Sequence, residues 1–223
     1  LFRSRIALKV AVDEKLIDQN PAKGVQNLKA KETVRREFRP AELKLLVPTL
    51  TGEWRGMFFL GINTGQRLND LAVLRWHQID LEAKTVALQA AKTKATVSLP
   101  LLDDTLEALA KLPPPDDPNA FVFPQTAALG RTSRSNAFRV ILAKVGLARP
   151  VKHRAELDAA TRTTSELSFH SLRHTATSML KKAGVSDSIA RAIIGHESEA
   201  ISRLYTHLDM ETMRTALEKM PKL

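Results

Sequence analysis

The 223-residue sequence contains no cysteine, which excludes a disulfide scaffold and thiolate metal sites. Glycine is also scarce, with nine residues, and the chain has neither a G-x-x-x-x-G-K-[ST] loop nor a G-x-G-x-x-G loop. Since such loops hold the phosphates of nucleotides, their absence removes sequence support for nucleotide hydrolysis. A chain without cysteine is compatible with the cytoplasm, where we expect this protein to act.

Long apolar runs are missing as well. The densest apolar stretch, Met57–Leu60, is followed at once by Gly61, whereas a membrane span needs about 18 apolar residues. No membrane partner is therefore expected. The chain opens Leu-Phe-Arg-Ser-Arg, with neither a methionine nor an apolar signal core, and we interpret it as an excised fragment of a longer protein.

Positive charge, by contrast, is abundant. Lysine and arginine number 34 against 24 acidic residues, which gives a formal net charge of +10. A surplus of this size predicts attraction to a polyanion such as nucleic acid. A generic basic surface accounts for the same balance, so charge alone does not decide between the two. With 43% hydrophobic residues, the chain is apolar enough to form a folded core.

The spacing of apolar residues, prolines and glycines predicts a mainly α-helical body with one small antiparallel β-sheet. The polar, charge-rich stretch 22–39 predicts a linker that precedes this body. We therefore expect residues 1–35 to be the end of a missing upstream domain with its linker. The expected helices cover 3–17, 40–46, 53–62, 68–74, 103–112, 133–145, 170–183, 187–194 and 209–219, and the expected strands cover 85–89 and 96–99.

Three separated segments contain residue types suited to phosphate chemistry. The first is Thr64-Gly65-Gln66-Arg67, in which Gly65 is expected to end a helix in the left-handed conformation and Arg67 to project from the turn. Asp70 lies three residues later on the same helical face, where its carboxylate can hold that guanidinium. A structural ion pair at a helix start is the competing interpretation.

The second segment is His170-Ser171-Leu172-Arg173-His174, in which His170 and Arg173 share one face of a helix. A guanidinium is a planar fork that fits phosphate, and an imidazole can accept or donate a proton near neutral pH. A merely basic helix face explains the same residues. We interpret His174 as a packing or supporting residue.

The third segment is Gly195-His196, which lies nine residues before Tyr205, the only tyrosine in the chain. By itself, a single tyrosine more often indicates a half-buried amphipathic ring than a reacting group.

Taken together and in this order, the segments resemble the tyrosine recombinase (phage integrase) family. Members of that family carry a T-G-x-R turn, an H-x-x-R helix, a Gly-His pair and a tyrosine about nine residues further on. Leu74-x-Trp76 and the basic hairpin that ends at Pro100 also match, and the resemblance covers about residues 36–215. It implies that residues 36–223 form a catalytic domain with the DNA breaking-rejoining enzyme fold.

The resemblance also implies a role for each matched residue. Tyr205 is expected to attack the scissile phosphorus and form a 3′-phosphotyrosyl link. Arg67 and Arg173 are expected to hold the non-bridging oxygens, and Asp70 to support Arg67, although the family has a glutamate there. His170 is expected to assist removal of the tyrosine proton.

The remaining implied roles concern the phosphoryl group and the leaving oxygen. His196 is expected to hydrogen-bond the phosphoryl group. Lys92 is the candidate general acid for the 5′-oxygen, and Lys94 is its alternative because the hairpin register is open. Since one phosphodiester replaces another, neither ATP nor a metal or other cofactor is expected. A phenol with a pKa of about 10 needs such a cationic pocket to react near neutral pH.

The expected partners are double-stranded DNA and further copies of the chain, as a tetramer on two duplexes. In that tetramer the apolar stripe of Met213, Ala216 and Met220 is expected to dock on a neighbouring protomer. Without the upstream domain, DNA affinity should be low and strongly salt-dependent. Three other functions stay open: type IB topoisomerase-like relaxation, a catalytically silent DNA-binding module, and a histidine-based phosphatase.

Overall fold

A computed structural model describes residues 2–25, 35–89, 96–115, 117–149, 165–195 and 210–223. Internal contacts divide the chain into two compact units, Leu1–Thr33 and Val34–Leu223. This boundary lies close to the one expected from the charge-rich stretch. The assignment of the first unit to an upstream domain stays a prediction.

The described residues of the first unit form one helix, α1, which runs from Phe2 to Asp13 and so ends before the predicted residue 17. The segment after it folds back on the helix. The Asn20 side-chain amide donates to the Arg5 carbonyl at 3.0 Å, and Arg5 Nε donates to the Ala22 carbonyl at 3.0 Å. These bonds hold the segment after α1 against the helix.

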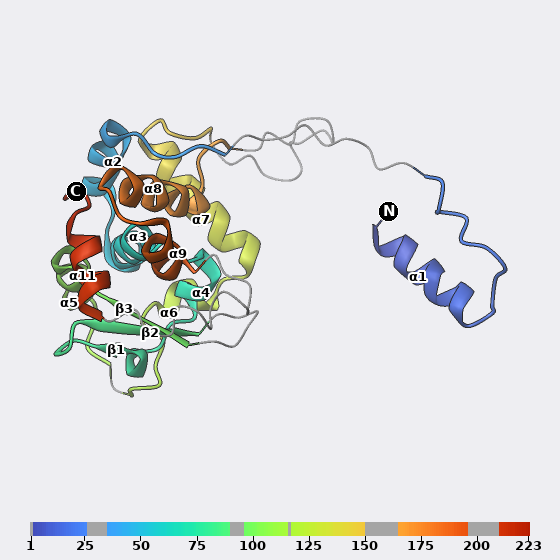
Figure 1. The fold of residues 1–223 in the computed structure, drawn as a ribbon, viewed down its shortest axis with the longest axis horizontal. Coiled ribbons are helices and arrows are strands. Elements are labelled where there is room, and N and C mark those ends of the chain that lie inside the picture. The colour runs from blue at the N-terminus through green and yellow to red at the C-terminus, as the bar shows by residue number, and fades with distance from the viewer. Residues whose placement is uncertain (1, 26–34, 90–95, 116, 150–164, 196–209) are drawn as a thin grey trace. The chain divides into compact units, whose positions relative to one another are not determined.

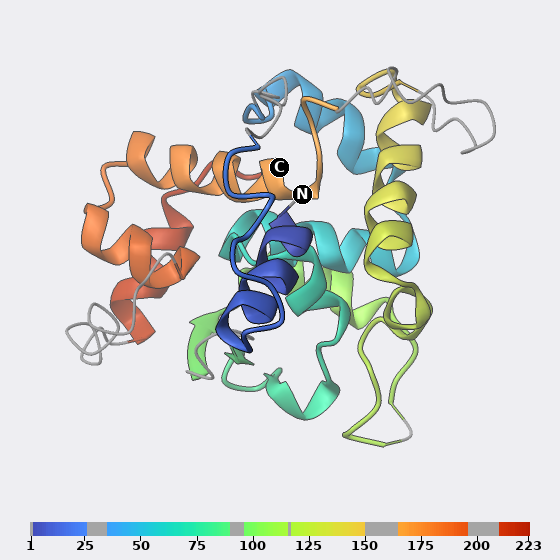
Figure 2. The ribbon, with the colours of Figure 1, turned by 90° about the vertical axis from the view of Figure 1, so that its right-hand side faces the viewer.

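The second unit is a bundle of helices with a small sheet at one end (Figure 1, Figure 2). Its central helix is α3, buried along its whole length from Gly56 onward because it is apolar on every side. It packs mainly against α8 and α5. Gly61 allows α8 to pack closely against α3, because a Cβ at this position would lie only 2.8 Å from the ring of Phe169.

The α-helices agree with the sequence prediction to within two residues in most cases. The described α-helices of this unit are α2 (Pro40–Leu46), α3 (Gly52–Thr64), α4 (Leu68–Ala72), α5 (Asp103–Ala110), α6 (Pro124–Ala128), α7 (Arg131–Lys144), α8 (Phe169–Lys182), α9 (Asp187–Ile194) and α11 (Met210–Glu218). The described part of this unit also contains two short 3-10 turns, Val47–Thr49 and Trp76–Gln78.

The sheet has three antiparallel strands in the order β1-β2-β3. They are β1 (Ile79–Asp80), β2 (Thr85–Gln89) and β3 (Thr96–Pro100), and Val86 pairs with Leu99. The predicted hairpin is therefore confirmed, with β1 as an additional edge strand. Lys92 and Lys94, between β2 and β3 in the sequence, lie outside the described residues.

The C-terminal helix α11 packs on its own chain, against β3 and α9. Met213, Ala216 and Met220 are all buried, with 6%, 4% and 6% of their surfaces exposed. Docking of this segment on a neighbouring protomer stays a prediction, but its premise, an exposed apolar stripe, is wrong. The reason is that the sheet and α9 offer the stripe an apolar surface within the same domain.

Candidate active site

The first predicted segment forms a tight turn between α3 and α4. Gly65 caps α3 in the left-handed conformation, with φ 66°, and its amide donates to the Gly61 carbonyl at 3.0 Å, which confirms the predicted cap. Arg67 is the extended residue that precedes α4, and its side chain is 57% exposed. Its guanidinium lies 3.9 Å from the carboxylate of Asp70.

The second segment opens helix α8, which carries His170 and Arg173. The helix begins after Ser168, whose amide donates to Ser171 Oγ at 3.1 Å. Leu172 and Ala176 are fully buried against the core and so fix the rotation of the helix. That rotation turns Arg173 inward, and only 2% of its surface is exposed.

Arg173 joins two glycine turns that are distant in the sequence. Its Nη1 donates to the Gly65 carbonyl at 2.8 Å, and its Nη2 donates to the Gly195 carbonyl at 3.0 Å. Gly195 caps α9 in the left-handed conformation with φ 71°, as Gly65 caps α3. A guanidinium has five N–H donors, so this one can still donate to another acceptor.

Arg67, Asp70 and Arg173 form one electrostatic cluster. Burial lowers the pKa of Arg173 to about 10, with the charge of Arg67 as a further cause, while Asp70 acts in the opposite direction. Arg173 is thus still a cation at neutral pH. Burial also raises the pKa of Asp70, and the charges of Arg67, Arg173 and Arg131 oppose that rise. The cluster therefore has more positive than negative charge and is suited to an anion.

His170 lies at the edge of the same cluster. Burial lowers its pKa to about 4, and the charges of His174, Arg35, Arg173 and Arg67 add to the shift. At neutral pH the imidazole is therefore uncharged and can accept a proton. The rings of His170 and His174 meet edge to face, with centroids 5.0 Å apart. Of the two roles predicted for His174, packing and support, its exposure to solvent argues against core packing, whereas its contact with His170 agrees with support.

The structure thus brings together four of the predicted site residues, Arg67, Asp70, His170 and Arg173. The other predicted residues, Lys92 with its alternative Lys94, His196 and Tyr205, lie outside the described residues.

Sequence reasoning missed two basic residues that act on the cluster. Arg131, the first residue of α7, affects Asp70, and Arg35, in the segment before α2, affects His170. Each is one of many cations in a basic chain, so no spacing rule distinguishes it in the sequence. Within the described part of the chain, no group of three or more acidic, histidine or cysteine side chains could hold a metal ion.

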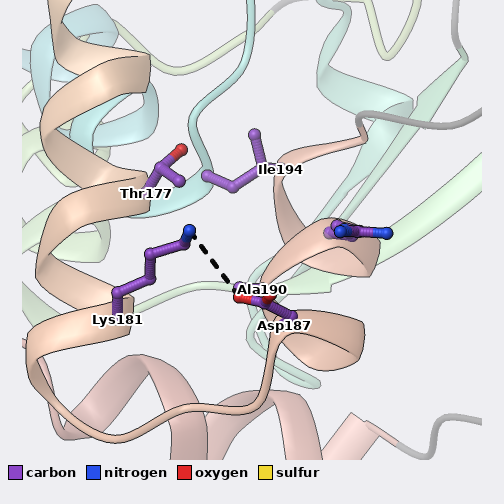
Figure 3. Close-up of a pocket in the computed structure, with 6 residues that line it drawn as sticks. Thr177, Lys181, Asp187, Ala190 and Ile194 are labelled. Carbon is purple, nitrogen blue, oxygen red and sulfur yellow. Dashed lines mark ion pairs between the residues drawn. The ribbon is translucent and has the colours of Figure 1, made fainter.

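A hollow of about 280 Å³ lies between α8 and α9, further along α8 than Arg173 (Figure 3). Its walls carry two cations, but Lys181 Nζ lies 3.8 Å from Asp187 Oδ1, which partly neutralises them. The Thr177 hydroxyl donates to the Arg173 carbonyl at 2.9 Å. This hollow is therefore a poorer anion site than the cluster. Its lining residues are Thr177, Lys181, Asp187, Ala190, Arg191 and Ile194.

The helical bundle with its three-stranded antiparallel sheet has the fold of a tyrosine recombinase catalytic domain. The model of the phage integrase family matches residues 37–212, and the chain belongs to that family. Among the described residues, no helix is both long and apolar enough to cross a membrane.

Two curated relatives resemble the sequence. The integrase of Salmonella phage P22 is 26% identical over 197 residues, which cover 87% of this chain and 49% of the relative. A XerC-like tyrosine recombinase of Caldanaerobacter subterraneus is 24% identical, over 96% of this chain and 62% of the relative. The chain therefore spans about half to three fifths of the length of these relatives.

Solved structures share the fold at low sequence identity. An integrase from mycobacterium phage Brujita superimposes with a TM-score of 0.63 at 18% identity, over 98% of this chain and 69% of the other. A lambda integrase dimer bound to a COC′ core site gives 0.62 at 20% identity, over 93% and 73%. These similarities confirm the predicted fold class.

Proposed function

We propose that the chain is the catalytic part of a site-specific DNA recombinase that cuts and rejoins strands through a 3′-phosphotyrosyl intermediate. The observation that carries the proposal is the convergence of Arg67 and Arg173, from distant parts of the chain, beside an uncharged His170. Two cations and a proton acceptor within one small volume are what an in-line attack on a phosphodiester requires.

The reaction exchanges one ester for another. The hydroxyl oxygen of Tyr205 forms a bond to phosphorus while the bond to the 5′-oxygen breaks. The phenolic proton goes towards His170, and Lys92, or Lys94 in its place, donates a proton to the departing 5′-oxygen. A free 5′-hydroxyl then reverses the steps and rejoins a strand. The bond energy is kept throughout, so the scheme uses neither ATP nor a metal.

The low pKa of His170 agrees with a role as a proton acceptor that becomes effective only when DNA is bound. Burial, together with the charges of His174, Arg35, Arg173 and Arg67, lowers the pKa of His170 and keeps the imidazole uncharged in the free protein. A phosphodiester carries one negative charge, which offsets these cations and raises the affinity of the imidazole for a proton. In this proposal His170 becomes an effective base when the substrate is in place, and His196 adds a hydrogen bond to the phosphoryl group.

We propose double-stranded DNA as the substrate and a tetramer on two duplexes as the working assembly, in the cytoplasm. The net charge of +10 supports a polyanionic partner. The similar lambda integrase was solved as a dimer on a core site, and a similar Tn1549 integrase with transposon right end DNA, at a TM-score of 0.55. Residues 1–35 would then be the end of a domain that contributes further DNA contacts.

The test is covalent trapping on a nicked suicide substrate from the natural attachment region. After cleavage, the short DNA fragment that carries the free 5′-hydroxyl is released at the nick and cannot rejoin. The covalent intermediate therefore accumulates and is seen as a protein–DNA adduct on a denaturing gel. We expect an adduct with the wild-type chain and none with Tyr205→Phe, which lacks only the hydroxyl. An equal yield of adduct in the Tyr205→Phe variant would refute the proposal, and equal trapping on unrelated DNA would indicate a type IB topoisomerase.

A further inference from the structure

Gln66 lies between the glycine cap of α3 and the exposed Arg67, and its side chain reaches another element. Its amide Nε2 donates to the Thr64 carbonyl and to the Ile193 carbonyl, each at 3.2 Å. The second bond spans 127 residues of sequence and ends in the last turn of α9. The Gln66 side chain therefore links the backbone next to Arg67 to helix α9, which ends at Gly195.

Two further contacts join the same pair of turns. Gly65 lies against Ile194, because a Cβ at Gly65 would fall 2.2 Å from Ile194 Cδ1. Arg173 donates to the carbonyls of Gly65 and Gly195. We call this group, Gly65–Gln66 with Ile193–Gly195 and Arg173 between them, the two-turn clasp.

We propose that Gln66 is a positioning residue for Arg67, an inference that rests on the proposed recombinase function. The only ion pair of Arg67 among the described residues is the 3.9 Å contact to Asp70, and more than half of the side chain is exposed. Its placement therefore depends on its backbone, which follows Gln66 directly. Without the bond to Ile193, the turn that presents Arg67 can shift relative to Arg173.

The clasp also sets the position of Arg67 relative to Arg173. In the proposed reaction, the two guanidiniums act on the same phosphoryl group. The Gln66 bond to Ile193 joins the turn that precedes Arg67 to the turn that binds Arg173, and small displacements of reacting groups are costly in rate. The role of Gln66 is thus to keep the two arginines correctly spaced without touching the substrate.

The test compares Gln66→Met with Gln78→Met. Methionine keeps the length of glutamine but cannot donate. Gln78 is a matched control, because its amide donates to the Ala87 carbonyl at 2.9 Å and its oxygen accepts from the Arg75 amide at 2.9 Å. Each change removes two hydrogen bonds, but only Gln66 adjoins the cluster.

We expect Gln66→Met to slow single-turnover adduct formation about tenfold, with DNA affinity within about twofold of wild type. Gln78→Met should leave the rate nearly unchanged even if it lowers the melting temperature as much. In an Arg67→Ala background the Gln66→Met effect should vanish, because there is no guanidinium left to misplace. A tenfold loss that persists in that background would overturn the proposal.

A second measurement does not depend on catalysis. The amides of Gly65 and Gly195 donate to Gly61 and Arg191 at 3.0 and 2.8 Å, so their hydrogen exchange reports on the two turns. We expect Gln66→Met to speed exchange at both glycines together, and Gln78→Met to affect neither. Unchanged exchange at Gly195 in Gln66→Met would refute the clasp, whether or not the chain cuts DNA. If exchange changes at both glycines but the wild-type chain forms no adduct, only the proposed recombinase function is contradicted.

Discussion

At the scale of single residues, the two arginines of the site have different physical situations. Arg67 is exposed and contacts one carboxylate at 3.9 Å, whereas Arg173 is buried and bonded to two backbone carbonyls. The removal of a buried, bonded cation leaves polar groups without partners, while the removal of an exposed one leaves little behind. In the proposed reaction both arginines would hold phosphate oxygens, but only Arg173 also joins parts of the fold through buried hydrogen bonds.

We therefore expect Arg67→Ala to change the free energy of unfolding by no more than about 0.5 kcal/mol. It should nevertheless slow adduct formation by roughly 100-fold or more, by analogy with the loss of an oxyanion donor. Arg173→Lys keeps a charge but loses the planar fork, and should destabilise the domain by about 1–3 kcal/mol. Urea unfolding and suicide-substrate kinetics give both quantities, and equal stability losses in the two variants would contradict this distinction.

His170 should make stability depend on pH. Its pKa is about 4 in the folded chain against an ordinary value of 6.5, so between these values the unfolded chain binds more protons. Stability then rises with pH across this window and is lost as pH falls towards 4. In His170→Gln this contribution is absent, so the melting temperature of the variant relative to wild type should rise as pH is lowered from 6.5 to 4.

Melting curves of the two proteins at several pH values test this expectation. Asp70, whose raised pKa acts in the opposite direction, is present in both proteins and largely cancels in the comparison. A melting-temperature difference that does not change with pH would show that the imidazole titrates normally in the folded chain.

At the scale of elements, helix α8 is tied to the segment that enters the domain. The Phe38 amide donates to Thr175 Oγ1 at 2.9 Å inside the core, two residues beyond Arg173. Two residues before Phe38, the Arg36 amide donates to the Glu166 carbonyl at 3.3 Å, and the Arg36 guanidinium binds both carboxylate oxygens of Glu42 at 2.8 Å. The segment that enters the second unit is thus bonded to α8, which carries His170 and Arg173, and to the residues just before α8.

We expect Thr175→Val to destabilise the domain by about 1–3 kcal/mol, because it leaves the buried Phe38 amide without an acceptor. Thr177→Val is the matched control on the same helix. Both hydroxyls donate to a carbonyl four residues earlier, at 2.7 and 2.9 Å, but only Thr175 also accepts an amide. Denaturant unfolding of both variants measures the difference, and similar losses would show that the Phe38 bond contributes little.

The elements also show which helices could be predicted from the sequence and which could not. Three of these helices were predictable, because α3 and α9 end at Gly65 and Gly195 and the apolar stripe of α8 is followed by Gly184. Helix α6 was not, since its five residues are capped by Glu53, which accepts from the Gln125 and Thr126 amides at 2.8 Å across more than 70 residues. Such a cap leaves no local signal.

At the scale of the whole molecule, residue order was enough to predict the family, the mainly helical fold and the grouping of Arg67 with His170 and Arg173. The burial of Arg173 was not predictable, because its partners are backbone carbonyls and any residue type supplies a carbonyl. The packing of α11 on its own chain was also missed, since an amphipathic helix has the same pattern whether its apolar face meets its own domain or a neighbour.

The carbonyls that bind Arg173 lie 108 residues earlier and 22 residues later in the chain. A ribosome that has just added Arg173 has therefore not yet made one of the two acceptors. Until Gly195 has been made and α9 has folded, the guanidinium lacks one of its two backbone acceptors. In the proposed function, the capacity to bind a phosphate would therefore arise only after residue 195 has been made, when the domain can fold.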